Sequence, residues 1–145
     1  MADASGRLPL RKESMTTTPP WISLSHRGRK EALPRAADRL GQLSRLLQTT
    51  ADASDVTVSI HLPSEHGTLL VALEGGNAFI GLVAPDGVYQ YVADADAEGE
   101  CDFIIGGQRT AIDGRYVLPV MTAISVLAPW VAGADPLSES AWERQ

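Results

Sequence analysis

The sequence predicts a single α+β domain, in which an antiparallel meander sheet of five or six strands carries an N-terminal and a C-terminal amphipathic helix packed on one face. Two stretches repeat apolar residues at spacings of three and four, which predicts helices over Glu31–Thr50 and Val117–Val131. Between them, apolar and polar residues alternate in short runs, as in strands with one buried face. Two to six turn residues separate these runs, and a parallel crossover needs a dozen or more, so neighbouring strands are predicted to be antiparallel.

The chain before the first helix divides into a tail and a short apolar segment. Residues 1–20 mix Ser, Thr, Pro and charge without an apolar period, so we expect a disordered tail, in which Met15 competes with Met1 as the translation start. Trp21, Ile22 and Leu24 alternate with serines and predict a brief strand or docking segment. Residues 21–145 are expected to form the single folded domain.

Each helix has a sequence reason. The apolar stripe of the first consists of Leu33, Ala36, Leu40, Leu43 and Leu47. Pro34 falls where a first helical turn tolerates proline, and Pro119 lies near the start of the second helix. Pro129 is expected to kink that helix or end its regular part, because proline removes a backbone donor.

The sheet is predicted from the alternating runs in chain order. They are Val56–Leu62, Leu69–Leu73, Ala78–Val83, Val88–Val92, Asp102–Ile105 and Thr110–Ile112, followed by Trp142 in a last short edge strand. Pro85-Asp86-Gly87 and Gly75-Gly76-Asn77 predict turns, because proline presets the backbone and glycine accepts a positive φ.

The tripeptide Gly106-Gly107-Gln108 has two interpretations. Peptide release factors place Gly-Gly-Gln at the ribosomal catalytic centre, on a projecting loop of a much larger protein with basic surfaces. Here the tripeptide joins two apolar runs in an acidic part of the chain. We therefore predict a hairpin turn, in which the glycines supply backbone freedom and Gln108 caps the turn or faces water.

No pattern in the sequence indicates catalysis, a metal or a cofactor. His26, His61 and His66 fall in three segments without the paired spacing of a metal site. Cys101, the single cysteine, cannot form an internal disulfide and lies among carboxylates, which disfavour a nucleophilic thiolate. We expect a protein that is not an enzyme. A small hydrolase stays the third interpretation, and it requires a pocket that gathers His61 or His66 with a carboxylate.

Charge is distributed unevenly along the chain. Residues 1–45 carry nine basic and four acidic side chains, whereas residues 46–145 carry three basic and fourteen acidic ones. An acidic body repels nucleic acid and favours basic partners, so direct nucleic-acid binding is not expected. The longest apolar run is far shorter than the roughly 18 residues of a membrane span, and the first residues lack a signal-peptide core. We expect a cytoplasmic protein without membrane contact.

The densest polar segment is an acidic run. Its five carboxylates, within nine residues, are Asp94, Asp96, Glu98, Glu100 and Asp102. The spacing is similar to the start of a calcium-binding EF-hand loop, but the twelfth position is Ile105 instead of glutamate, and no helices flank the run. A plain solvated loop and a patch that binds a basic protein surface both stay open as interpretations.

The C-terminal third adds a family resemblance. Its motifs are Gly106-Gly107-Gln108, Tyr116-Val117-Leu118-Pro119 leading into a helix with Ala123 and Trp130, then Gly133, Pro136 and Trp142-Glu143. In this order and spacing the segment resembles immunity protein family one of bacterial polymorphic toxin systems, over roughly residues 56–143. The resemblance implies a compact α+β protein encoded beside a secreted toxin, frequently a nucleic-acid deaminase. It also implies that Gly107, Gln108, Pro119 and Trp142 shape the fold.

Resemblance and charge lead to one expectation. A toxin that acts on nucleic acid carries a basic cleft, and an acidic partner can occupy it by mimicking phosphate charge. We expect an immunity protein that binds and neutralises a cognate toxin domain through Asp94–Asp102. A secretion chaperone or adaptor, which binds a translocated protein without blocking an active site, is the alternative.

Overall fold

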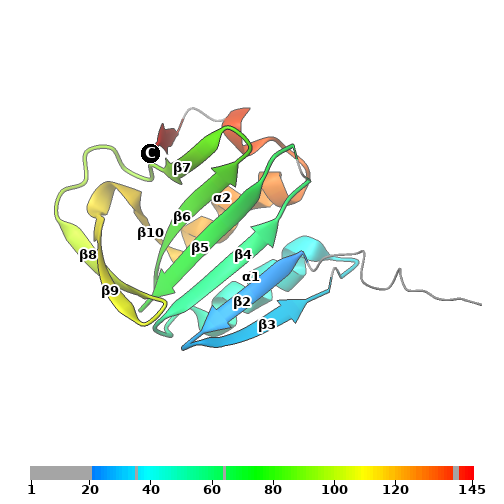
Figure 1. Cartoon of the computed structure of the whole chain (residues 1–145), viewed down its shortest axis with the longest axis horizontal. Coiled ribbons are helices and arrows are strands. Elements are labelled where there is room, and N and C mark those ends of the chain that lie inside the picture. The colour runs from blue at the N-terminus through cyan, green and yellow to red at the C-terminus, as the bar shows by residue number, and fades with distance from the viewer. Residues whose placement is uncertain (1–20, 35, 64, 139–140) are drawn as a thin grey trace, which may run out of the picture.

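The computed structural model describes residues 21–34, 36–63, 65–138 and 141–145, and the expected tail lies outside them. It has an α+β fold with a large antiparallel sheet and two helices behind it (Figure 1). The strands of this sheet are β2 (Ile22–His26), β3 (Arg29–Leu33), β4 (Val56–His61), β5 (Thr68–Glu74), β6 (Asn77–Ala84), β7 (Gly87–Tyr91), β10 (Val117–Pro119) and β11 (Trp142–Arg144). The helices are α1 (Arg39–Thr50) and α2 (Val120–Val131), and β8 (Glu100–Ile105) pairs with β9 (Gln108–Asp113) in a separate hairpin.

The predicted meander is confirmed at the centre of the sheet but not in its extent. Strands β4, β5, β6 and β7 follow one another and pair antiparallel in that order. The full order is β11-β7-β6-β5-β4-β2-β3, with β10 also paired to β6, which makes eight strands instead of five or six. The β8–β9 hairpin, which we had expected inside the meander, leaves the sheet (Figure 1).

The predicted N-terminal helix is wrong over its first part. Residues 29–33 form β3, which pairs with β2 along its whole length, and α1 begins only at Arg39. Pro34 is therefore not in a helical turn; its carbonyl accepts a hydrogen bond from Gln42 Nε2 at 3.0 Å. The helix begins where Asp38 caps it, because the Asp38 carboxylate accepts the backbone N–H of Gly41 at 2.9 Å.

The C-terminal helix is confirmed with a later start. Residues 117–119 form β10 on the edge of β6, and Pro119 occupies the position just before the first turn of α2. Pro129 lies in the last turn, and the helix ends two residues later at Val131. The predicted edge strand near Trp142 is confirmed as β11, which pairs with β7.

The main core lies between the helices and one face of the sheet. Alternate residues of β4, β5 and β6 face Leu43 and Leu47 of α1 and Leu127 of α2, all of them fully buried. Each buried aliphatic side chain of this kind contributes about 1.5–3 kcal/mol relative to its exposed state. This apolar layer fixes both helices on the same face.

A second, smaller core lies on the opposite face. Phe103 of β8 is fully buried there against Ala72, with Ile112 and Tyr116 beside it. Its ring meets Phe79 edge to face, with centroids 5.9 Å apart. The hairpin therefore covers only one end of this face. We call the rest of it, formed by the outward residues of β2, β4, β5, β6 and β7, the open face.

Candidate partner-binding site

The acidic run, Asp94–Asp102, lies in the loop between β7 and β8 and continues along the first part of β8. We call the whole run the acidic loop. All five predicted carboxylates are exposed: Asp94, Asp96, Glu98, Glu100 and Asp102. On β8, Cys101 and Phe103 point towards the second core, so Glu100 and Asp102 point outwards. Asp113 lies directly opposite Glu100 on β9 and adds another exposed carboxylate to this side.

The acidic loop is tied to a short turn at Gly114–Tyr116. The carbonyl of Arg115 accepts the backbone N–H groups of Ala93 at 2.8 Å and Asp94 at 3.1 Å. Gly114 donates to the carbonyl of Gly99 at 2.8 Å, and a Cβ at Gly114 would lie 2.8 Å from the carbonyl oxygen of Glu98. Glycine is thus required there because the loop backbone passes too close for a side chain. The loop consequently presents its charges from a defined position.

The same turn is fastened to the last strand. Arg115 Nη2 lies 2.9 Å from Glu143 Oε1, and the Tyr116 hydroxyl donates to the same carboxylate oxygen. This hydrogen bond, together with burial, raises the pKa of Tyr116 above the ordinary value of 10.0. The contact ties the loop, the turn and β11 together.

Glu74 holds the hairpin to the main sheet. One of its carboxylate oxygens accepts the backbone N–H of Ile104 at 3.1 Å and that of Asp55 at 3.3 Å. Burial acts to raise the pKa of Glu74, but the hydrogen bonds from Ser54, Ile104 and Asp55 outweigh it and the pKa is lowered from 4.5. The ionised carboxylate therefore joins β8, the end of β5 and the loop before β4.

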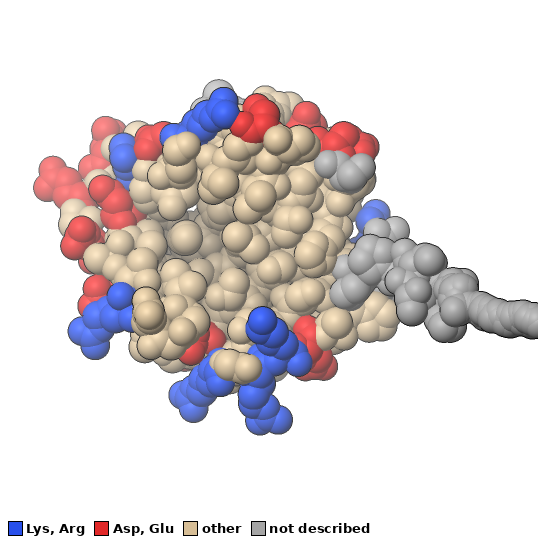
Figure 2. Space-filling model, viewed as in Figure 1, with Lys and Arg blue, Asp and Glu red and all other residues tan. Residues whose placement is uncertain are grey.

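The open face is uncharged at its centre and partly apolar. Leu70, Val83 and Val88 lie on it and are 36%, 44% and 47% exposed. Val83 and Val88 are opposite one another in neighbouring strands. Figure 2 shows no charged side chain at the centre of this face, while acidic residues gather beside β8 and basic residues along the edge that carries β2 and β3.

A groove of about 540 Å³ runs between the open face and the tip of the β8–β9 hairpin. Most of the side chains that line it are small, and the lining residues are Ser23, Leu24, Ser25, Lys30, Thr57, Ser59, Ile105 and Gly106. The sequence analysis did not predict the groove. Three of its lining residues, Ser23, Thr57 and Ser59, are the polar positions that alternate with buried residues in β2 and β4. Alternation predicts only that these positions lie on the face opposite the buried one.

The residues named from the family resemblance do not form one site. Gly106 and Gly107 make the two-residue turn of the hairpin, with φ of 59° and 82°, and Gln108 is exposed as the first residue of β9, so the hairpin interpretation is confirmed. Pro119 is exposed before α2. Trp142 donates from Nε1 to the carbonyl of Pro136 at 2.8 Å and packs 5.3 Å from the ring of Trp130.

The histidines lie on three segments, because His26 ends β2, His61 ends β4, and His66 lies in the turn between β4 and β5. The Nε2 atom of His61 lies 3.5 Å from the hydroxyl oxygen of Ser23. No group of three or more His, Cys, Asp or Glu that could hold a metal occurs in the described part of the chain. Among the same residues, no helix is long and apolar enough to cross a membrane.

A scan against models of protein families and a search of curated protein sequences both found no match to this chain. The resemblance to the immunity family accordingly rests on the order and spacing of motifs between Phe103 and Glu143.

Proposed function

We propose that the protein is an immunity protein that binds a cognate toxin domain and occludes its active site. The observation that carries the proposal is the exposure of all five carboxylates between Asp94 and Asp102, on a tethered loop and the first part of β8, beside an open face that is uncharged at its centre. A protein of this kind needs no chemistry of its own, because a preformed surface is sufficient to block a substrate cleft.

The open face and the acidic loop together have the composition that is usual in a protein–protein interface. An interface has a core depleted of charged residues and a polar rim. The open face, with Leu70, Val83 and Val88 exposed, would supply the core, and the acidic loop would supply one side of the rim. Rim charges act mainly on the rate of encounter and on the choice of partner. The acidic loop would therefore select a basic partner, and the open face would retain it.

A toxin that acts on nucleic acid, such as a deaminase, fits the charge of this surface. Such an enzyme must attract a polyanion, so its substrate cleft is basic. The carboxylates are distributed over a loop that turns at Ala95–Asp96 and over the start of β8, and they can occupy positions that phosphates would take. The family resemblance independently supports a toxin of this class.

Co-expression with the toxin encoded beside this gene tests the proposal. The wild-type protein should rescue growth, and a variant with Asp94, Asp96, Glu98, Glu100 and Asp102 changed to the matching amides should not. The five side chains are exposed, so the variant should keep the circular dichroism spectrum and melting behaviour of the wild type. Full rescue by a folded five-fold variant would remove the acidic loop from the mechanism.

A secretion chaperone is the second candidate, and the exposed aliphatic residues of the open face favour it, because chaperones bind apolar segments. The same co-expression separates the two functions. An immunity protein restores growth, whereas a chaperone raises the soluble yield or export of the toxin and leaves growth inhibited.

A further inference from the structure

We propose that the outer edge of β3 is a second docking site, where an extended segment of another protein adds to the sheet as a further strand. The segment would carry a basic residue opposite Glu31 and acidic residues opposite Arg29 and Lys30. This site lies at the opposite edge of the sheet from β11 and does not involve the acidic loop. It therefore goes beyond the proposed function.

The hydrogen-bond pattern of the hairpin shows which backbone groups of β3 point outwards. Arg27 and Gly28 form its two-residue turn with φ of 53° and 82°, so His26 and Arg29 are the closing hydrogen-bonded pair. Hydrogen-bonded pairs then alternate with non-hydrogen-bonded pairs along the hairpin. Lys30 and Ala32 belong to non-hydrogen-bonded pairs, so their backbone N–H and C=O groups point away from β2.

These outward groups are available in the described part of the chain. No described strand pairs with the outer edge of β3, and the first four of its residues are exposed. An unpaired edge of this kind is a template for strand addition. Two residues with free donors and acceptors can make four main-chain hydrogen bonds with an added strand.

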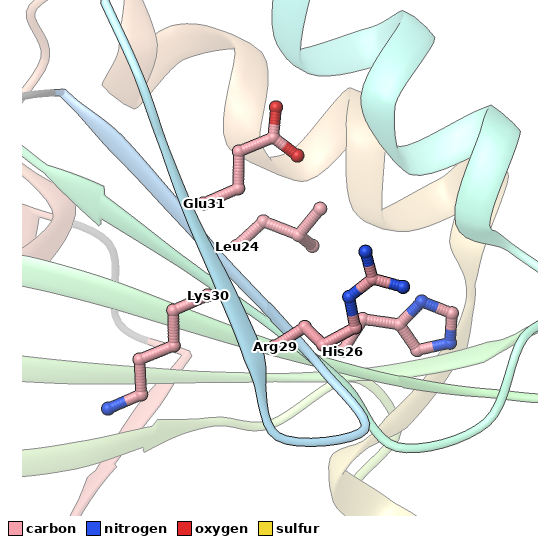
Figure 3. Close-up of a pocket in the computed structure, with 5 residues that line it drawn as sticks. All are labelled: Leu24, His26, Arg29, Lys30 and Glu31. Carbon is pink, nitrogen blue, oxygen red and sulfur yellow. The ribbon is translucent and has the colours of Figure 1, made fainter.

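Side-chain specificity can come from a cavity beside the same edge. A cavity of about 330 Å³ is lined by Leu24, His26, Arg29, Lys30 and Glu31. Figure 3 shows Leu24, His26, Arg29 and Glu31 on the side of the hairpin that faces the helices, and Lys30 on the other side. In strand addition the main chain gives affinity, and pockets for alternate side chains give specificity. The cavity lies on the side of the hairpin that faces the helices, which is the side towards which every second side chain of the added strand would point.

Charge decides what kind of strand fits. Arg29, Lys30 and Glu31 are exposed and form no ion pair within the described residues. Opposite charges directly across a strand pair stabilise it, and like charges destabilise it. Two copies of the chain could also pair through their β3 edges. In the antiparallel register that uses the outward N–H and C=O groups of Lys30 and Ala32 in both copies, Glu31 of one copy would lie opposite Glu31 of the other. A segment of another protein with complementary charges is therefore favoured over self-pairing.

Selection from a displayed library of random dodecapeptides on the full chain tests the site. The decisive variant is Ala32→Pro, which removes one outward N–H, and an edge strand tolerates proline at such a position. Ala32→Val is the matched control, because it keeps the N–H and suits a strand. Enriched peptides should combine a basic residue with neighbouring acidic ones, bind Ala32→Val like the wild type, and bind a folded Ala32→Pro at least tenfold more weakly.

Four outcomes would overturn the proposal. The first is a library that yields no binding peptide, and the second is equal binding to Ala32→Pro. The third is a dimer in sedimentation equilibrium that Ala32→Pro dissolves, which would make the edge a self-interface. Peptides that lose binding only when Asp94–Asp102 are neutralised would count for the proposed function and against this site.

Discussion

At the scale of single residues, Glu74 is a side chain that fastens the hairpin to the main sheet. Its carboxylate accepts backbone N–H groups from Asp55 and Ile104, which lie 19 and 30 residues away in the chain. No local pattern could have predicted this role, because a Glu that follows a strand is ordinarily solvated. Only the fold brings these donors to it.

Replacing Glu74 with Gln should lower the free energy of unfolding by about 1–2 kcal/mol at pH 7, because the charge-assisted hydrogen bonds weaken. The pKa of Glu74 is lowered in the folded state, so its contribution is present above the ordinary value of 4.5 and is lost as pH falls through the folded pKa. The deficit of the variant should therefore shrink on acidification below pH 4.5.

Urea unfolding of wild type and variant over this pH range measures the effect. Glu65→Gln is the control, because Glu65 is exposed and should give equal stability at every pH. If the loss of unfolding free energy in Glu74→Gln stayed the same in acid, the charge of Glu74 would not be the cause of that loss.

At the scale of elements, the β8–β9 hairpin was predictable and its packing was not. Two glycines between apolar runs indicate a two-residue turn, and the structure has one. That the hairpin leaves the meander depends on Phe103 meeting Phe79 and Ala72, a contact between distant segments. Alternation identifies which face of a strand is apolar, but not which core buries it.

Substitutions in Gly106-Gly107-Gln108 can distinguish a structural role of this tripeptide, as a hairpin turn, from a chemical role of Gln108. Gly107→Ala should raise amide exchange across β8 and β9, because alanine at φ of +82° costs about 1–2 kcal/mol. Gln108→Ala should change exchange little, because the Gln108 side chain is exposed. The reverse order, with Gln108 the more sensitive, would contradict the hairpin interpretation.

The wrong helix boundary has a physical explanation. Leu33 and Ala36 continue the period of Leu40, Leu43 and Leu47, so the sequence pattern extends through Pro34 without a break. Tertiary pairing of residues 29–33 with β2 outweighs this periodicity, and Asp38 supplies the cap that starts the helix. Strands β4 to β7 were predictable because their alternation has no competing helical period.

At the scale of the whole molecule, charged residues surround a face that is uncharged at its centre. Acidic residues gather beside β8 and basic ones beside β2 and β3, with Leu70, Val83 and Val88 exposed between them. The sequence predicted the acidic run, because it is contiguous. It could not predict the open face, which exists because the hairpin covers only one end of the sheet.

The association rate of this protein with a toxin domain of the proposed class, measured at low salt and at about 0.15 M, tests the central claim most directly. Neutralising Asp94, Asp96 and Glu98 should slow association at low salt and flatten its salt dependence. Neutralising the exposed acids Asp52, Glu65 and Asp86, an equal change in net charge, should leave the rate much closer to that of the wild type. Equal rates for the two triple variants would contradict the claim that the acidic loop receives the partner.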